Sequence, residues 1–330
     1  VLGHYCRDAH GLYLFDGKPV YEYPIEEVRK NIVWGTANFD LGKNEVRSFL
    51  ISCIFFWLDY FHVDGFRIDA VSNIIYWLGE KNRGVNQKGV EFLRMLNSAV
   101  ADSFPYALMF AEDSTDYPLV TKPVNEGGLG FSFKWNMGWM NDVLGYFEED
   151  ALFRKYMHNN ITFGLTYAFS ERFILPFSHD EVVHGKKSLL NKMPGDYWQK
   201  FANFRLLIGF LMVHPGKKLI FMGGEFAHME EWKDKEELDW ALYDYPSHDS
   251  AARFARDIIK IYKNESALYE TDHDINGFQW IDADNENQSI FSFIRKNKNA
   301  DSMLIAILNC TPLVYHNYCL GVPVNGKYKE

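Results

Sequence analysis

The stretch from His62 to Val71 places a cation and carboxylates at strand spacing, reading His-Val-Asp-Gly-Phe-Arg-Ile-Asp-Ala-Val. Side chains alternate along a β-strand, so Arg67 and Asp69 would share one face. A guanidinium beside a carboxylate keeps that carboxylate ionised and orients it. The pattern therefore predicts either a nucleophilic Asp69 or an Arg–Asp pair that only satisfies itself within a core.

Two further acidic residues follow apolar strand patterns. Glu112 comes after one such strand, and Asp180, with His179 before it, comes after another. Each carboxylate alone could be a solvated loop residue or a helix cap, but three at strand ends favour retaining glycoside chemistry. That chemistry needs a nucleophilic carboxylate and a protonated acid about 5–5.5 Å apart. We expect Asp69 to be the nucleophile, Glu112 an acid whose pKa is raised by burial, and Asp180 an anion that stabilises positive charge on the sugar.

A metal site is the competing interpretation of the third motif. It would use His179, Asp180 and His184 as ligands. The two histidines are five residues apart, which does not place them on one helical face, and no glutamate lies where a zinc protease needs one. We therefore expect no metal site and no cofactor, and a structural or substrate-contacting role for His184.

Helical and strand patterns alternate through most of the chain. Helical periodicity covers residues 44–61, 90–101, 138–148, 197–213 and 250–262, and strands start near residues 62, 107, 130, 173 and 218. Strands separated by helices predict parallel neighbours. Polar or acidic strand ends favour a (β/α)-barrel over a doubly wound sheet, because no phosphate-binding glycine turn follows the first strand.

The pattern changes near residue 267 to strands without helices. Apolar strands over 277–281, 289–295 and 303–309 alternate with Asp/Asn-rich turns. We predict two domains: residues 1–266 as the barrel part and residues 267–330 as a partial all-β sandwich.

Composition limits the function classes. A net charge of −10 without a basic cluster argues against a nucleic-acid partner and favours a neutral substrate. Aromatic residues make up 17% of the chain, more than a core needs, and exposed rings are platforms for sugars. No apolar run reaches the roughly 18 residues of a membrane span. The four cysteines lack metal or disulfide spacing, which predicts reduced thiols in a cytoplasmic protein.

The strand-end motifs resemble those of the α-amylase superfamily. In order and content the matching segments are Asp64-Gly-Phe-Arg-Ile-Asp69, Phe110-Ala-Glu-Asp-Ser114 and Phe177-Ser-His-Asp-Glu181. The surrounding sequence is similar to the glycogen and starch branching enzymes of that superfamily, in segments Asp8–Leu12, Asn125–Phe131, Lys134–Trp139, His179–Gly185 and Glu237–Trp240. The resemblance implies the last five strands of a (β/α)8 TIM barrel followed by an all-β domain, and an α-glucan as partner.

The resemblance also implies a role for each candidate site residue. Asp69 would form a covalent glucosyl intermediate, Glu112 would be the general acid/base, and Asp180 would stabilise the distorted sugar. The implied substrate-binding residues are Arg67, which orients the nucleophile, and His179 and His4, which contact the sugar of the first subsite. In a branching enzyme the 6-hydroxyl of another glucan chain, not water, resolves the intermediate.

Two alternatives remain open at this stage. One is an α-glucan hydrolase, although the segments Lys134–Trp139 and Val183–Gly185 favour branching. The other is a non-catalytic glucan-binding fragment. Family members carry a β-sandwich and three barrel strands before the position of Val1, so we expect this chain to be a fragment that by itself is poorly folded and weakly active or inactive.

Overall fold

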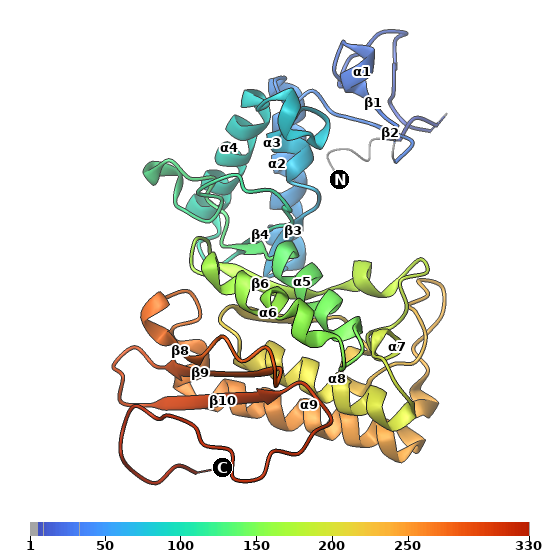
Figure 1. The fold of residues 1–330 in the computed structure, drawn as a ribbon. Coiled ribbons are helices and arrows are strands. Elements are labelled where there is room, and N and C mark those ends of the chain that lie inside the picture. Colours follow the sequence, from blue (N-terminus) through green and yellow to red (C-terminus); the bar gives the residue numbers. More distant parts are fainter. Residues whose placement is uncertain (1–5, 9, 33, 330) are drawn as a thin grey trace. The chain divides into compact units, whose positions relative to one another are not determined.

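The computed structural model describes residues 6–8, 10–32 and 34–329 of the chain. It contains two compact units, Val1–Asn136 and Met137–Glu330 (Figure 1). Each unit has its own core of buried apolar side chains.

The first unit has three parallel strands with helices between them. Its elements are α1 (Glu26–Arg29), β1 (Lys30–Asn31), β2 (Thr36–Ala37), α2 (Asn44–Phe61), β3 (Gly65–Ile68), α3 (Ser72–Ile75), α4 (Gln87–Ser103), β4 (Leu108–Ala111) and β5 (Phe133–Trp135). The parallel strands lie in the order β3-β4-β5. Helices α2 and α4 pack together, and α4 begins at Asn86, whose side chain accepts a hydrogen bond from the Gly89 N–H.

Strand β3 approaches β4 unusually closely at its first residue. A Cβ atom at Gly65 would lie 2.0 Å from the Leu108 carbonyl oxygen. Only glycine fits such an approach, because any side chain would push the two strands apart. Gly65 thereby permits the β3–β4 pairing in which Arg67 lies opposite Phe110.

The second unit joins two parallel strands to an antiparallel sheet. Its helices and strands are α5 (Met137–Glu148), α6 (Asn159–Thr162), β6 (Phe173–Phe177), α7 (Leu189–Lys192), α8 (Tyr197–Val213), β7 (Lys217–Ile220), α9 (Pro246–Asn264), α10 (Ser266–Tyr269), β8 (Phe278–Asp282), β9 (Ile290–Lys296) and β10 (Met303–Asn309). Strands β6 and β7 pair in parallel. The second sheet has the order β10-β9-β8, and β10 contacts α8 (Figure 1).

The predicted types of the elements agree with the structure better than their predicted bounds do. Helices α2 and α8 have the predicted bounds, and the strands of the barrel part are parallel as expected. The strand predicted from residue 62 to 71 is wrong in length, because only Gly65–Ile68 pair. His62 ends α2 with a left-handed φ of 55°, and Ala70 turns the chain with a φ of 46°. The predicted loop before residue 44 carries the short elements α1, β1 and β2.

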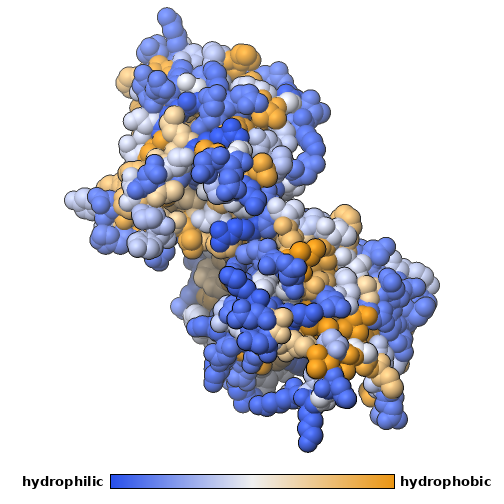
Figure 2. All heavy atoms as spheres, turned by 90° about the vertical axis from the view of Figure 1, so that its left-hand side faces the viewer, coloured by the Kyte–Doolittle hydropathy of each residue, from blue (hydrophilic) through white to orange (hydrophobic). Residues whose placement is uncertain are grey.

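The surface carries part of the high aromatic content, as composition predicted. Figure 2 shows hydrophobic residues exposed in patches between hydrophilic ones. Rings that are more than half exposed include those of Tyr60, Tyr106, Trp198, Trp240 and Tyr245. Exposed rings of this kind are available to ligands, whereas the core uses others such as Trp139.

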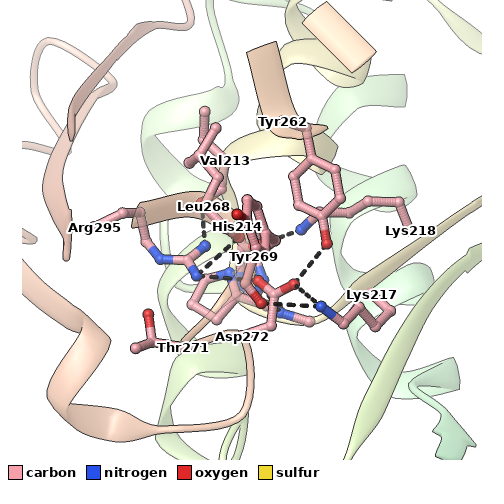
Figure 3. Close-up of polar contacts among 12 residues, drawn as sticks. Val213, His214, Lys217, Lys218, Tyr262, Leu268, Tyr269, Thr271, Asp272 and Arg295 are labelled. Atoms are coloured by element: carbon pink, nitrogen blue, oxygen red, sulfur yellow. Dashed lines mark hydrogen bonds and ion pairs between the residues drawn. The ribbon is translucent and has the colours of Figure 1, made fainter. Parts of the chain in front are cut away.

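A buried ion cluster connects the antiparallel sheet to the parallel strands of the second unit (Figure 3). Asp272 and Arg295 have fully buried side chains, and their charged groups lie 3.0 Å apart. The other carboxylate oxygen of Asp272 accepts a 2.6 Å hydrogen bond from the Tyr262 hydroxyl and lies 3.1 Å from Lys217 Nζ. Arg295 also donates to the Val213 carbonyl at the end of α8. One carboxylate thus holds together the ends of α8 and α9, strand β7 and strand β9.

We expect Asp272→Asn to lower the free energy of unfolding by about 3–5 kcal/mol, because Arg295 would stay buried without its countercharge. Urea denaturation measures this change. The exposed Asp257 of α9 is the matched control, and Asp257→Asn should change stability by less than about 0.5 kcal/mol. A loss below about 1 kcal/mol in Asp272→Asn would show that backbone carbonyls alone satisfy Arg295.

The same region predicts acid sensitivity. His214 is fully buried, and burial lowers its pKa from 6.5 to about 3. Between these values the unfolded chain binds a proton that the folded chain excludes, so stability present above pH 6.5 is lost as the pH falls toward 3. The slope for one proton is about 1.4 kcal/mol per pH unit. Unfolding free energies measured from pH 7 to 4 should therefore fall less steeply in His214→Leu, whereas the exposed-site control His316→Leu should keep the parent slope.

Candidate active site

The guanidinium group of Arg67 binds two carboxylates at the ends of neighbouring strands. Arg67 Nη2 lies 2.9 Å from Asp69 Oδ1 and 2.6 Å from Glu112 Oε2. Because both oxygens contact the same nitrogen, these two distances limit their separation to at most 5.5 Å. The two carboxyl groups therefore lie close together, as the carboxyl pair of a retaining glycosidase does. The structure confirms the predicted Arg67–Asp69 pair and adds Glu112 to it.

The register of β3 and β4 brings these residues together. Ile68 lies opposite Ala111, so Asp69 and Glu112 leave their strands at the same level. The Ala70 N–H donates a 3.0 Å hydrogen bond to Glu112 Oε2. Ala70 adopts a left-handed φ of 46°, which is unfavourable for a residue with a Cβ atom and occurs where surrounding contacts enforce it. The hydrogen bond from Ala70 therefore holds the turn after β3 against the Glu112 side chain.

The electrostatics of Glu112 suit a proton donor. Burial raises the pKa of the Glu112 carboxyl, and the nearby Asp69 carboxylate raises it further. The Ala70 N–H and the Arg67 cation act in the opposite direction, but the net pKa is above the ordinary value of 4.5. This confirms the expectation that an apolar strand before Glu112 desolvates its carboxyl group.

Two residues of β5 support this centre and were missed by the sequence analysis. The Arg67 guanidinium lies 4.6 Å from the centroid of the buried Trp135 ring, at cation–π distance. Lys134 pairs with Asp113 at 2.9 Å and donates to the Thr115 carbonyl at 2.6 Å, which fixes the turn that follows Glu112. Their position in a predicted strand beside β4 was the available signal.

The second unit presents His179 and Asp180 directly after β6. His179 Nε2 lies 3.3 Å from Asp180 Oδ1, and both side chains are about one-third exposed. Ser178 and Glu181 form a capping box around this turn: Ser178 Oγ accepts from the Asp180 N–H, and Glu181 Oε2 accepts from the Ser178 N–H. The turn is therefore held rigidly while the two candidate side chains remain accessible.

Two aromatic rings, those of Phe221 and Trp232, lie beside His179. The Trp232 ring is 6.1 Å from the imidazole and 5.0 Å from Phe221, the residue after β7. The Trp232 backbone N–H donates to the Val182 carbonyl at 2.9 Å. The loop after β7 thus contributes a ring to the site at His179, which the sequence analysis did not identify.

The six predicted site residues fall into three groups. Arg67, Asp69 and Glu112 come together in the first unit, and His179 and Asp180 come together in the second. Convergence of these two groups stays a prediction. His4 lies outside the described residues.

The chain is similar to curated bacterial enzymes over all its residues. It is 58% identical over 330 residues to the 1,4-alpha-glucan branching enzyme GlgB of Bacillus subtilis (strain 168), covering 100% of this chain and 53% of the relative. It is 59% identical to that of Geobacillus stearothermophilus, covering 52% of the relative. Residues 280–330 match the family described as alpha amylase, C-terminal all-beta domain. The similarity thus extends over the whole chain and agrees with the resemblance of the strand-end motifs to the α-amylase superfamily. It spans about half the length of the curated relatives it matches.

Solved structures share the fold of this chain. A cyclomaltodextrinase superposes with a TM-score of 0.58 at 18% identity, over 93% of this chain and 46% of the other. An acarbose-soaked debranching enzyme of Nostoc punctiforme gives 0.61 at 17% identity, over 90% and 62%. These matches confirm the predicted α/β fold, part of a (β/α)8 barrel followed by an all-β domain. Among the described residues no helix is both long and apolar enough to cross a membrane.

We expect Arg67→Met to raise the pKa of Glu112 by about 1–3 pH units, because the variant removes a cation that lowers it. Carbon-13 NMR titration of the glutamate carboxyls measures this pKa. Lys122→Met, which removes an exposed cation of the same unit, is the control and should leave it unchanged. A fall in the Glu112 pKa in Arg67→Met would mean that the variant opens the site to water instead.

Proposed function

We propose that the protein containing this chain is a 1,4-α-glucan branching enzyme of glycogen biosynthesis. It would cleave an α-1,4 bond and transfer the released chain to a 6-hydroxyl, making an α-1,6 branch. The observation that carries this proposal is the Arg67-bridged pair of Asp69 and Glu112, because a retaining double displacement needs two carboxyl groups close together. The identity of about 58% to relatives named as branching enzymes supports the choice of reaction.

In the first step Asp69 attacks the anomeric carbon and the glycosidic C–O bond breaks. Arg67 keeps the Asp69 carboxylate charged and oriented for this attack. Glu112 gives its proton to the departing oxygen, so the first product leaves with a free hydroxyl. The raised pKa of Glu112 provides the protonated acid that the step needs.

In the second step the 6-hydroxyl of another glucan attacks the same carbon and the bond to Asp69 breaks. Glu112, now a carboxylate, accepts the proton of that hydroxyl. Two inversions return the anomeric carbon to the α configuration. Exclusion of water at this stage separates branching from hydrolysis, because water would otherwise accept the glucosyl group.

We assign the remaining site residues to the sugar. Asp180 would stabilise positive charge on the ring at the transition state, and His179 and His4 would contact its hydroxyls. The accessible His179–Asp180 turn supports this assignment. Residues 1–266 would form the barrel part and residues 267–330 the all-β domain, supported by strands β8–β10 and the match over 280–330.

The proposal also specifies partner and location. The partner would be an α-glucan such as glycogen, amylose or amylopectin, and neither nucleic acid nor a membrane. The net charge of −10 supports this choice, because nucleic acid and anionic lipid would be repelled. We place the protein in the cytoplasm, a location consistent with the free cysteines Cys6, Cys53, Cys310 and Cys319.

The test is a branching assay on a complete barrel. These 330 residues would replace the matching segment of the Bacillus subtilis relative, and the chimera would be incubated with amylose beside the isolated chain. We expect new α-1,6 linkages by proton NMR with few new reducing ends. Asp69→Ala should abolish them, and Glu112→Gln should reduce the rate about 100-fold or more. Asp59→Asn, at an exposed position of α2, is the matched carboxylate control.

The other outcomes are equally decisive. Reducing ends without branches would assign an α-glucan hydrolase. Neither product from the chimera, under conditions where the relative itself branches amylose, would refute the proposed function. Activity of the chimera but not of the isolated chain would support the function and the expectation that the chain is weakly active or inactive alone.

A further inference from the structure

A short 3₁₀ helix after β7 presents two aromatic rings whose planes are nearly parallel. The helix spans Trp240–Asp244. Because a 3₁₀ helix has three residues per turn, side chains three positions apart eclipse, so Trp240 and Tyr243 extend from the same side. Their ring centroids are 6.3 Å apart and their planes differ by 21°. Trp240 is 53% exposed and Tyr243 37% exposed, so the pair is open to solvent.

A third, buried ring holds this pair in place. Phe226 has no exposed surface, and its ring lies 5.5 Å from that of Trp240 and 4.9 Å from that of Tyr243. Phe226 packs in a small core with Leu242, and its carbonyl oxygen bonds His248 Nδ1 at 3.0 Å. The exposed rings therefore rest on a fixed support, so a ligand that stacks on them orders few side chains.

Charged groups lie near Tyr243, one ring of this pair. The carboxylates of Glu225 and Asp249 and the Arg256 cation lie close enough to Tyr243 to influence its pKa, which burial raises. Flat rings with adjacent hydrogen-bonding groups match the chemistry of a sugar, which has C–H faces that stack and hydroxyls that donate and accept.

The position of the pair in the fold also points to substrate. Strands β6 and β7 are parallel, so the His179–Asp180 turn and the segment after β7 both leave the carboxyl ends of their strands. That end carries the active site in (β/α)-barrels. Trp240 and Tyr243 belong to the segment after β7. Among the described residues, the ring contacts of this pair do not include His179 or Asp180.

We infer that Trp240 and Tyr243 form a second binding platform for an α-1,4-glucan, separate from the candidate catalytic residues. This inference rests on the proposed function, since it takes the substrate class from it. Consecutive glucose units would stack on the two rings, with hydroxyls bonded by the surrounding carboxylates and Arg256. The platform would hold a long chain near the reacting end and would matter less for a short one.

The test measures binding of maltoheptaose to the chain by isothermal titration calorimetry. Because each ring would contribute a stacking surface, Trp240→Ala should raise Kd about tenfold, which is about 1.4 kcal/mol, and Tyr243→Ala should raise it by several fold. Trp240→Phe, which keeps a flat ring, should retain much of the affinity. The control is Tyr156→Ala, which removes a 76% exposed ring of the same unit and should leave Kd unchanged.

A second readout separates this platform from the reaction site. In the chimera, Trp240→Ala should raise KM for long amylose about tenfold and change kcat less than twofold, whereas Asp69→Asn should abolish turnover and keep maltoheptaose affinity. Circular dichroism must show the same fold in each variant, and if Trp240→Ala unfolds, Tyr243→Leu replaces it.

The inference is overturned if Kd is the same in Trp240→Ala and the parent, or if the parent chain does not bind maltoheptaose. Branching by the chimera in either case would leave the proposed function intact. Absence of branching with tight, Trp240-dependent binding would refute the proposed function and retain a glucan-binding platform.

Discussion

The Arg67 guanidinium is the contact on which the candidate site depends, because one nitrogen atom binds both Asp69 and Glu112. Three features of the fold place it there. Gly65 lets β3 approach β4, the register aligns the two strand ends, and Trp135 lies against the guanidinium. A cation held in this way can position two carboxylates of opposite role within bonding distance of one sugar.

Burial decides how these carboxylates divide their roles. Asp69 and Glu112 share the same cation, so Coulomb attraction alone would favour ionisation of both. Desolvation is the largest influence on Glu112 and raises its pKa despite the cation. Burial of Glu112 therefore favours the protonated form of this carboxyl group, which is the form that a general acid needs.

In the second unit, the accessible strand-end side chains and the buried, paired charges lie at different places. Beyond the carboxyl ends of β6 and β7 lie accessible polar and aromatic side chains, including His179, Trp232 and Trp240. Charges elsewhere in this unit are buried and paired, as in the Asp272–Arg295 cluster that joins the antiparallel sheet to α8 (Figure 3). Because the cluster anchors the all-β domain, the strand-end loops are free to present side chains to a ligand.

Sequence alone determined the element types and most of the candidate chemistry. Helix α2, the alternation of strands and helices, and the Arg67–Asp69 pair follow from periodicities of 3.6 and 2, which are local properties of the chain. Tertiary structure decided what joins distant residues: the Glu112 contact to Arg67 and the ring of Trp135 over it. Strand register and burial arise only on packing, so no local pattern specifies these contacts or the direction of the Glu112 pKa.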